Sequence, residues 1–301
     1  MAIEKRSLDQ WRAAFRKYGG SARHLLANTE RKVEDLIDAA LCNYEDIRSL
    51  FPFGCHGAGD FENDTCYALT MINPRLDKNH RIDRACFQGG IISQYLAQKV
   101  FEFNEGALID DRMAKEYRCL VSDKDRRSAT AHLFERAGHR YMFKALSLPV
   151  TVRSLSSPNS QITLDLSHIE RINVFEPQAL GSYDRLDASD YYQPRPEIAA
   201  GIDSFVLEVD ANGTPSTVVM FQFIVSTTQP SRVGVMSKLW VEHARARPMV
   251  KWKLVFVVPQ EIERDFALQR WTSVGAQTVW DSRVEQYVLG VGADALWEAA
   301  R

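Results

Sequence analysis

Two polar side chains, Asp203 and Gln222, lie near the ends of two adjoining apolar runs in a pattern that predicts a β-hairpin. The runs are rich in Val, Ile and Phe, and the turn-forming segment 210–216 separates them. In an antiparallel pair the start of one strand lies beside the end of the next, so the two side chains are expected to converge at one sheet edge. A carboxylate beside a carbonyl-type oxygen is half of a site for a hard cation. The alternative is that Asp203 ends a loop and Gln222 is an ordinary polar strand residue.

A second carboxylate, Glu135, lies upstream on a helix that the apolar pattern predicts over residues 129–146. His139 follows it by four residues, a spacing that puts both side chains on one helical face. The same spacing is common in surface pairs. The residue types alone therefore leave open whether Glu135 belongs to a site.

The elements that must position these side chains change in character along the chain. The first 123 residues predict a helix over 8–18 that Ser7 caps, further helices over 29–50 and 84–103, partial helix in 105–123 and a short strand at 67–72. From Pro149 the apolar period becomes two, which predicts short strands joined by turns, at 151–155, 161–166, 172–175, 191–194, 202–209 and 218–225.

The last part of the sequence predicts a helix over 233–247, a buried strand over 251–258, a short helix over 261–266 and a strand near 284–291. We therefore expect an α/β (α+β) fold with a mixed, largely antiparallel sheet flanked by helices. This domain, residues 124–301, would follow a mostly helical lobe of residues 1–123.

The composition limits the function classes only in part. The chain has 301 residues, 45% of them hydrophobic, which is enough for a substantial core. With 39 acidic and 37 basic residues, no global charge favours nucleic acid, although local basic patches stay possible. The five cysteines are Cys42, Cys55, Cys66, Cys86 and Cys119. Their odd number and the lack of a C-x-x-C pair favour a reducing compartment. Their spacing fits no standard zinc site.

Neither a standard secretion signal nor a membrane span is predicted. The start has a basic beginning without an apolar core region, and no run of 18 apolar residues occurs. We therefore expect an intracellular protein, nuclear or cytoplasmic, with no membrane partner.

Several short segments follow one another in a characteristic order: HLFERAGH at 132–139, YYQP at 191–194, IDSF at 202–205, MFQFIVS at 220–226, LVFVVP at 254–259 and QYVL at 286–289. In this order they resemble the nuclease-like C-terminal region shared by Crinkler effectors and retrotransposon hot spot proteins, especially the fungal versions. Upstream, FRKYGGSAR at 15–23 is similar to a segment near the end of the P-loop NTPase region that precedes this nuclease.

The resemblance implies a restriction-endonuclease-like fold of the PD-(D/E)XK superfamily. In the family pattern Glu135, Asp203 and Gln222 would form the metal and phosphodiester site, with the two carboxylates as ligands of Mg²⁺. DNA is the partner that this resemblance implies. Candidates for contacts with phosphate are four residues of the same region, His139, Arg140, Arg232 and Lys238.

Two positions depart from the family pattern. Ile224 stands where the family has the Thr of Q-x-T, and Gln229 precedes Pro where the family often has His. Ile cannot polarise water, and Gln does not titrate as His does. These departures favour an alternative, a catalytically degenerate effector or a truncated mobile-element-derived protein that binds a host protein or nucleic acid without cleavage. The chain also lacks a Walker A lysine loop, so no ATP hydrolysis is expected.

Overall fold

A computed structural model describes residues 7–19, 25, 30–43, 50, 53–55, 66–76, 82–104, 111–123, 130–157, 159–175, 186–194, 202–227, 251–271, 280 and 282–300. The chain divides into two compact units, residues 1–136 with residue 301, and residues 137–300. The point of division lies inside helix α7 (Ala131–Ala145). The predicted domain boundary after residue 123 stays a prediction, because residues 124–129 lie outside the described part of the chain.

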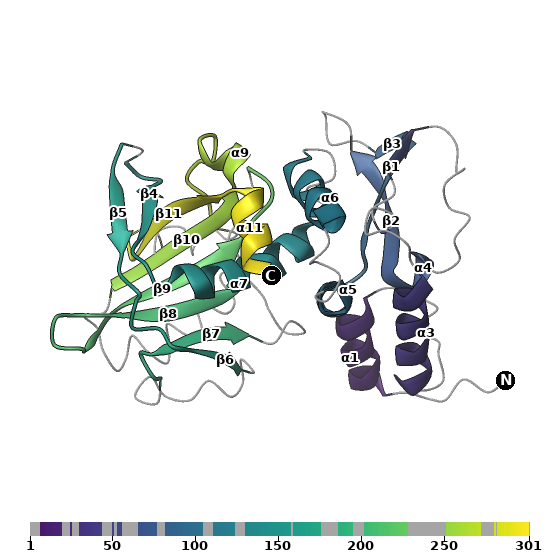
Figure 1. Cartoon of the computed structure of the whole chain (residues 1–301), viewed down its shortest axis with the longest axis horizontal. Coiled ribbons are helices and arrows are strands. Elements are labelled where there is room, and N and C mark those ends of the chain that lie inside the picture. The colour runs from purple at the N-terminus through teal and green to yellow at the C-terminus, as the bar shows by residue number, and fades with distance from the viewer. Residues whose placement is uncertain are drawn as a thin grey trace. The chain divides into compact units, whose positions relative to one another are not determined.

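The first unit combines helices with a small sheet (Figure 1). Its described helices, besides the start of α7, are α1 (Leu8–Tyr18), α3 (Glu30–Asn43), α4 (Cys66–Leu69), α5 (Gln94–Asn104) and α6 (Asp111–Ser122). Its described strands form an antiparallel sheet in the order β1-β3-β2, made of β1 (Phe53–Cys55), β3 (Ile82–Ile91) and β2 (Thr70–Leu76). The expectation of a mostly helical lobe is thus confirmed only in part.

Helix α1 begins and ends as its sequence predicts. The Ser7 hydroxyl accepts a hydrogen bond from the Gln10 amide nitrogen at 3.2 Å, and the Gln10 side chain accepts one from the Ser7 nitrogen at 2.7 Å. This reciprocal pair satisfies two backbone N–H groups at the start of the helix. At the other end Gly19 has a φ of 70°, a conformation that glycine adopts at little cost.

The prediction of a helix over 84–103 is wrong for its first part. Residues Ile82–Ile91 form strand β3, and the helix there is the shorter α5. Two consecutive glycines, Gly89 and Gly90, disfavour a helix interior. In β3 they lie opposite Ile72 and Met71 of β2, where strand pairing satisfies the backbone instead.

Two other predicted boundaries in this unit also change. The predicted strand 67–72 begins only at Thr70, after the short helix α4, and it continues past Pro74 to Leu76. The strand pairing shifts register between Pro74 and Arg75, as a residue without an N–H at a sheet edge requires. The predicted helix 29–50 is described as α3, and residues 44–49 lie outside the described part.

The second unit is built on an eight-stranded sheet with the order β5-β4-β11-β10-β9-β8-β7-β6 among the described residues (Figure 1). The strands are β4 (Val150–Ser154), β5 (Gln161–Leu164), β6 (Arg171–Phe175), β7 (Asp190–Pro194), β8 (Ser204–Val209), β9 (Pro215–Phe223), β10 (Lys251–Pro259) and β11 (Val284–Val291). Strands β9, β10 and β11 are parallel, as are β6 and β7, and the other pairs are antiparallel. The α+β class with a mixed, largely antiparallel sheet is confirmed.

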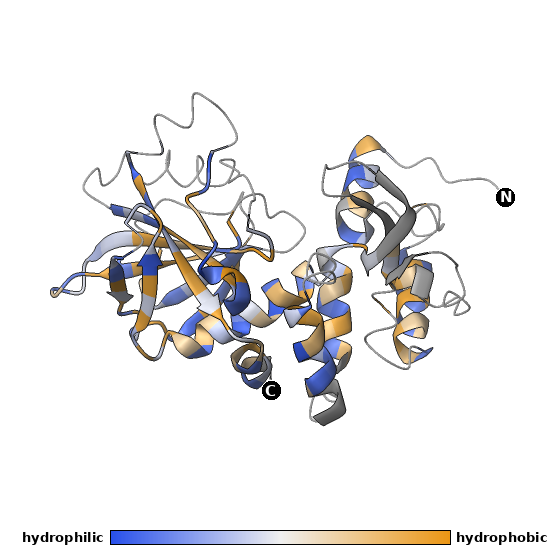
Figure 2. Cartoon of the chain, turned by 90° about the horizontal axis from the view of Figure 1, so that it is seen from above, coloured by the Kyte–Doolittle hydropathy of each residue, from blue (hydrophilic) through white to orange (hydrophobic). Residues whose placement is uncertain are grey.

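Apolar side chains cover both faces of the centre of this sheet. Strand β10 is buried almost continuously, as its apolar sequence predicts. On one face a core cluster contains Phe205, Met220, Phe256 and Trp271. Figure 2 shows the long hydrophobic stretches on the strands and on the helices. Burial of this apolar area is the main source of stability for the unit.

Two predicted helices and one unpredicted helix remain in this unit. The predicted helix 261–266 is shorter, because α9 spans Gln260–Glu263. Helix α11 (Ala293–Ala300), rich in strong helix formers, was not predicted. The predicted helix 233–247 lies outside the described residues. In the part of the chain that the structure describes, every helix is too short or too polar to cross a bilayer.

Candidate functional site

The hairpin of β8 and β9 places Asp203 and Gln222 side by side. Ser204 lies opposite Phe221 in the strand register, so Asp203 stands opposite Gln222 at the open end of the hairpin. The Asp203 nitrogen donates to the Phe221 carbonyl at 3.0 Å, and the Phe223 nitrogen donates to Asp203 Oδ2 at 2.7 Å. These two hydrogen bonds bracket Gln222. The convergence that the hairpin pattern predicts is therefore present, and we call this pair the Asp203–Gln222 corner.

The turn at the other end of the hairpin fixes this register. Asp210 Oδ1 accepts hydrogen bonds from the Asn212 nitrogen at 2.8 Å and the Thr214 nitrogen at 2.9 Å. Gly213 has a φ of 75°, in the left-handed region that glycine tolerates. A one-residue slip would move the Gln222 side chain to the other sheet face, so the turn chemistry helps to hold the corner together.

Gln222 is a buried polar residue with an unsatisfied oxygen. Its exposed fraction is 5%, and its buried Oε1 has no hydrogen-bond partner among the described residues. Residues directly opposite in an antiparallel pair share a sheet face. Strand alternation puts Gln222 on the face of Val218 and Met220, which belong to the apolar core. A carbonyl oxygen left without a partner there costs about 1–3 kcal/mol, so the corner holds an acceptor in need of a cation or a donor.

The position two residues after Gln222 is purely apolar. Ile224 is 1% exposed and belongs to the same core cluster as Phe256 and Trp280. Its backbone nitrogen donates to the Val257 carbonyl at 2.9 Å, which ties this end of β9 to β10. The departure from the family pattern at this position is therefore part of the packing of the sheet.

Glu135 lies on the part of α7 that belongs to the first unit, whereas Asp203 and Gln222 belong to the second. Its Oε2 lies 3.8 Å from His132 Nδ1, and its side chain is 16% exposed. Its membership in a site with Asp203 therefore stays a prediction.

His139, predicted to contact phosphate, is buried against the hairpin. Its exposed fraction is 5%, and its Nδ1 lies 2.9 Å from the Tyr191 hydroxyl, which lies 2.6 Å from Ser204 Oγ. The His139 ring also packs edge-on against Phe223, with ring centroids 4.6 Å apart. Ser204 and Phe223 are the direct neighbours of Asp203 and Gln222. The contacts of His139 are therefore those of a residue that positions the corner.

Sequence reasoning missed Gly138 as a determinant of this packing. A Cβ atom added to Gly138 would lie 2.4 Å from Phe223 Cε1, so the absence of a side chain lets α7 approach the sheet this closely. The glycine beside the histidine in the HLFERAGH segment was the available signal. Tyr191 and Ser204 were also present in the quoted motifs, but their hydrogen bonds connect residues far apart in sequence.

Of the other three residues predicted to contact phosphate, the structure describes one. Arg140 follows His139 on α7 and is half-buried. Arg232 and Lys238 lie outside the described residues.

The donor set of the corner suits a hard cation in type. Mg²⁺ takes oxygen ligands and is usually held by one or two protein carboxylates together with waters and substrate phosphate. A carboxylate and an unsatisfied amide oxygen are such donors. The described residues contain no group of three or more His, Cys, Asp or Glu that could hold a metal ion, so the corner offers a partial ligand set.

Cys42 and Cys119 are free and exposed.

Comparison with known proteins leaves the chain without an assigned relative. Neither a protein-family model, nor a curated protein, nor a solved structure matches it.

Proposed function

We propose that the second unit is a nuclease-type domain of the Crinkler and retrotransposon hot spot kind, which engages DNA through a divalent cation at the Asp203–Gln222 corner. The observation that carries this proposal is the buried, unsatisfied Oε1 of Gln222 at the strand end where Asp203 bonds to the Phe221 carbonyl and the Phe223 nitrogen. A buried oxygen acceptor without a protein partner is satisfied in native proteins by an ordered water or an ion, or has a functional role. DNA as a partner implies action inside a cell, in the nucleus or the cytoplasm.

Asp203 and Gln222 would hold the cation. Bound there, Mg²⁺ would polarise a phosphodiester oxygen and lower the pKa of a coordinated water. Asp203 also accepts the hydrogen bond of the Phe223 nitrogen, which keeps its carboxylate beside Gln222. The His139–Tyr191–Ser204 chain supports the other side of the same strand ends.

The dual role of Asp203 decides which variant tests the proposal. Asp203→Ala would remove both the charge and the acceptor for the Phe223 nitrogen, so lost activity would not be distinguishable from local unfolding. Asp203→Asn keeps an oxygen acceptor and removes the charge that a cation needs.

The experiment is a plasmid-nicking assay with Mg²⁺ or Mn²⁺, together with thermal unfolding in the same buffers. The native chain should nick DNA and unfold at a higher temperature when the cation is present, because a ligand that binds only the folded state stabilises it. Asp203→Asn should remain folded and lose both effects. Equal nicking by both proteins would place the cleavage in another site or in a contaminant and would overturn the proposal.

A second candidate is a degenerate domain that binds DNA or a host protein without cleavage. The burial of Ile224 in the core favours it, because no polar side chain stands at the position where the family pattern puts one. This candidate predicts a salt-dependent shift of DNA in a gel with no nicking under any divalent cation. A host-protein role would be indicated by the absence of both nicking and DNA binding.

A further inference from the structure

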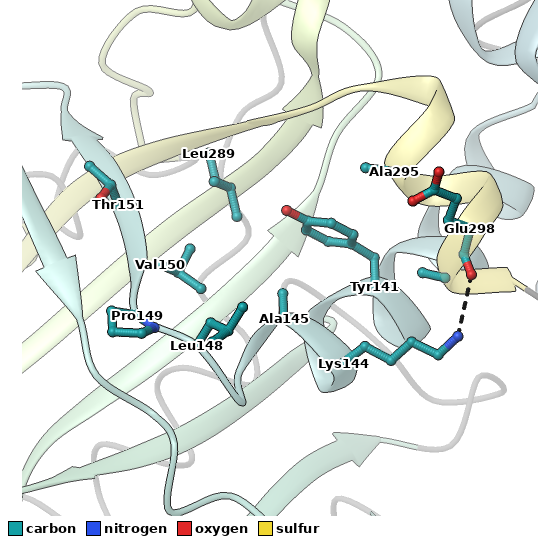
Figure 3. A pocket seen from close by; sticks show the side chains of 11 residues that line it. Tyr141, Lys144, Ala145, Leu148, Pro149, Val150, Thr151, Leu289, Ala295 and Glu298 are labelled. Carbon is teal, nitrogen blue, oxygen red and sulfur yellow. Dashed lines mark hydrogen bonds between the residues drawn. The ribbon is translucent and has the colours of Figure 1, made fainter.

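The second unit carries a pocket away from the corner, formed by the end of α7, strands β4 and β11, and helix α11 (Figure 3). Its volume is about 640 Å³. Binding sites for small molecules typically enclose about 300–1,000 Å³. The pocket is therefore large enough for a compact organic ligand.

The lining of the pocket is mainly apolar and is centred on one aromatic ring. In Figure 3 Tyr141 lies between an apolar end, with Leu148, Val150 and Leu289, and a charged end, with Lys144 and Glu298. Burial raises the pKa of Tyr141, so its hydroxyl stays protonated near neutral pH. The Tyr141 ring thus offers a flat apolar surface with a neutral polar tip.

The charged end of the pocket holds a cation that is available to a ligand. Lys144 Nζ donates one long hydrogen bond, 3.3 Å, to the backbone carbonyl of Glu298, and no ion pair of Lys144 with a described carboxylate is present. In Figure 3 the Glu298 carboxylate points away from this ammonium. Lys144 also lies in the last turn of α7, where a positive charge is favourable. An ammonium has three donors, however, so two remain for another acceptor.

We propose that this pocket binds a small aromatic organic acid, with its ring system against Tyr141 and its acidic group at Lys144. The apolar end buries the ring, and the ammonium supplies the charge that distinguishes an acid from a neutral molecule of the same shape. This site is independent of the Asp203–Gln222 corner and of the proposed nuclease function.

The probes that test this site are anilinonaphthalene sulfonate, an aromatic acid, and N-phenylnaphthylamine, its neutral counterpart. Both are titrated by fluorescence into the native chain of 301 residues. We expect one binding site per chain for the acid. Lys144→Gln should weaken the acid about fivefold, the effect of losing one partly exposed ion pair, and leave the neutral probe unchanged. Glu298→Gln should tighten the acid, because it removes a nearby like charge.

Ala295→Phe, which fills the pocket from α11, should weaken both probes at least about tenfold by steric exclusion. Ala293→Phe on the same helix lies outside the lining and should bind both probes as the native chain does. Leu148→Glu is a second test that spares the core, since Leu148 is 68% exposed, and it should weaken the acid more than the neutral probe.

Three outcomes would overturn the inference. The pocket is excluded as the binding site if Ala295→Phe, once its folded state is verified by thermal unfolding, binds both probes normally. If Ala295→Phe does not fold, normal binding of both probes by Leu148→Glu excludes the pocket in the same way. An equal effect of Lys144→Gln on the acid and on the neutral probe would exclude recognition of the acidic group, and absence of binding to the native chain would exclude the site altogether.

Discussion

At the scale of single residues, Gln222 is the clearest anomaly of the fold. Its amide oxygen is buried and unsatisfied among the described residues, in a position between the hydrogen bonds that hold Asp203 to β9. Stability by itself would favour an apolar residue there, since an unpaired buried acceptor costs free energy. This departure from a satisfied core is the reason that Gln222 is part of the proposed cation site.

The residue-scale prediction concerns Gln222→Met. Without divalent cations this variant should have a free energy of unfolding higher by about 1 kcal/mol, because the unsatisfied oxygen is replaced by an apolar chain of similar length. The measurement is urea denaturation in the presence of a chelator. A lower free energy of unfolding would show that the amide makes a favourable interaction in the native protein. Added Mg²⁺ should stabilise the native chain and have no effect on the variant.

At the scale of elements, the position of α7 on the sheet depends on one small residue. Gly138 lies against the Phe223 ring, next to the buried chain from His139 through Tyr191 to Ser204. Helix propensity alone would favour Ala over Gly at this position by about 1 kcal/mol. The close approach to a ring embedded in the sheet reverses that preference.

The element-scale prediction is that Gly138→Ala lowers the free energy of unfolding by about 1–3 kcal/mol, the usual cost of overpacking. The added Cβ would lie 2.4 Å from Phe223 Cε1, so either the ring or the helix must move. Chemical denaturation measures the loss. Gly292→Ala is the control without steric overlap, since nothing lies within 4 Å of the added Cβ there, and it should lower the free energy of unfolding less than Gly138→Ala does. Phe223→Leu in the Gly138→Ala background should recover part of the loss, and no recovery would contradict this account.

At the scale of the whole molecule, the two units differ in what stabilises them. Both units bury apolar residues, and in the first unit three helices also meet at a half-buried ionic cluster. In this cluster Glu34 of α3 accepts hydrogen bonds from Tyr18 of α1 at 2.8 Å and from Tyr95 of α5 at 2.7 Å. Lys17 Nζ lies 3.1 Å from Glu34 and 4.7 Å from the centre of the Tyr95 ring.

This cluster predicts acid sensitivity for the first unit. Desolvation alone raises the pKa of Glu34, but the hydrogen bonds from Tyr95, Tyr18 and Lys17 outweigh it, so its pKa is lowered in the folded state. A carboxyl group with a lowered folded pKa contributes stability above its unfolded pKa and loses that contribution as pH falls through the folded value. The first unit should therefore lose about 1 kcal/mol from this group below about pH 4, a small effect because solvent screens the cluster.

Hydrogen exchange of the amides in α1, α3 and α5 measures this loss separately from the second unit. Native chain and Glu34→Gln should differ in protection at pH 7 and converge as the pH falls, because the variant keeps an acceptor but has no charge to lose. A difference that does not change with pH would show that packing, and not ionisation, sets the contribution of this residue.

Local rules account for several elements in each of the two units. The serine cap of α1, the period-two strands and the Asp-Ala-Asn-Gly turn all depend on neighbours in sequence. The same rules predict that Asp203 and Gln222 meet, because a hairpin joins consecutive strands by a short turn. Local rules failed at residues 84–91, where pairing with a neighbouring strand outweighed an apolar pattern that predicts a helix.

The amino-acid sequence by itself thus determined the class of the fold, the hairpin and the identity of the side chains at its open end. Only the tertiary structure decided that β9, β10 and β11 run parallel in the centre of the sheet, that His139 is buried against Tyr191, and that Gln222 Oε1 has no partner among the described residues. The physical reason is the range of the interactions. Turns, caps and strand periods follow from adjacent residues, whereas strand order, burial and hydrogen-bond satisfaction depend on contacts between residues far apart in the chain.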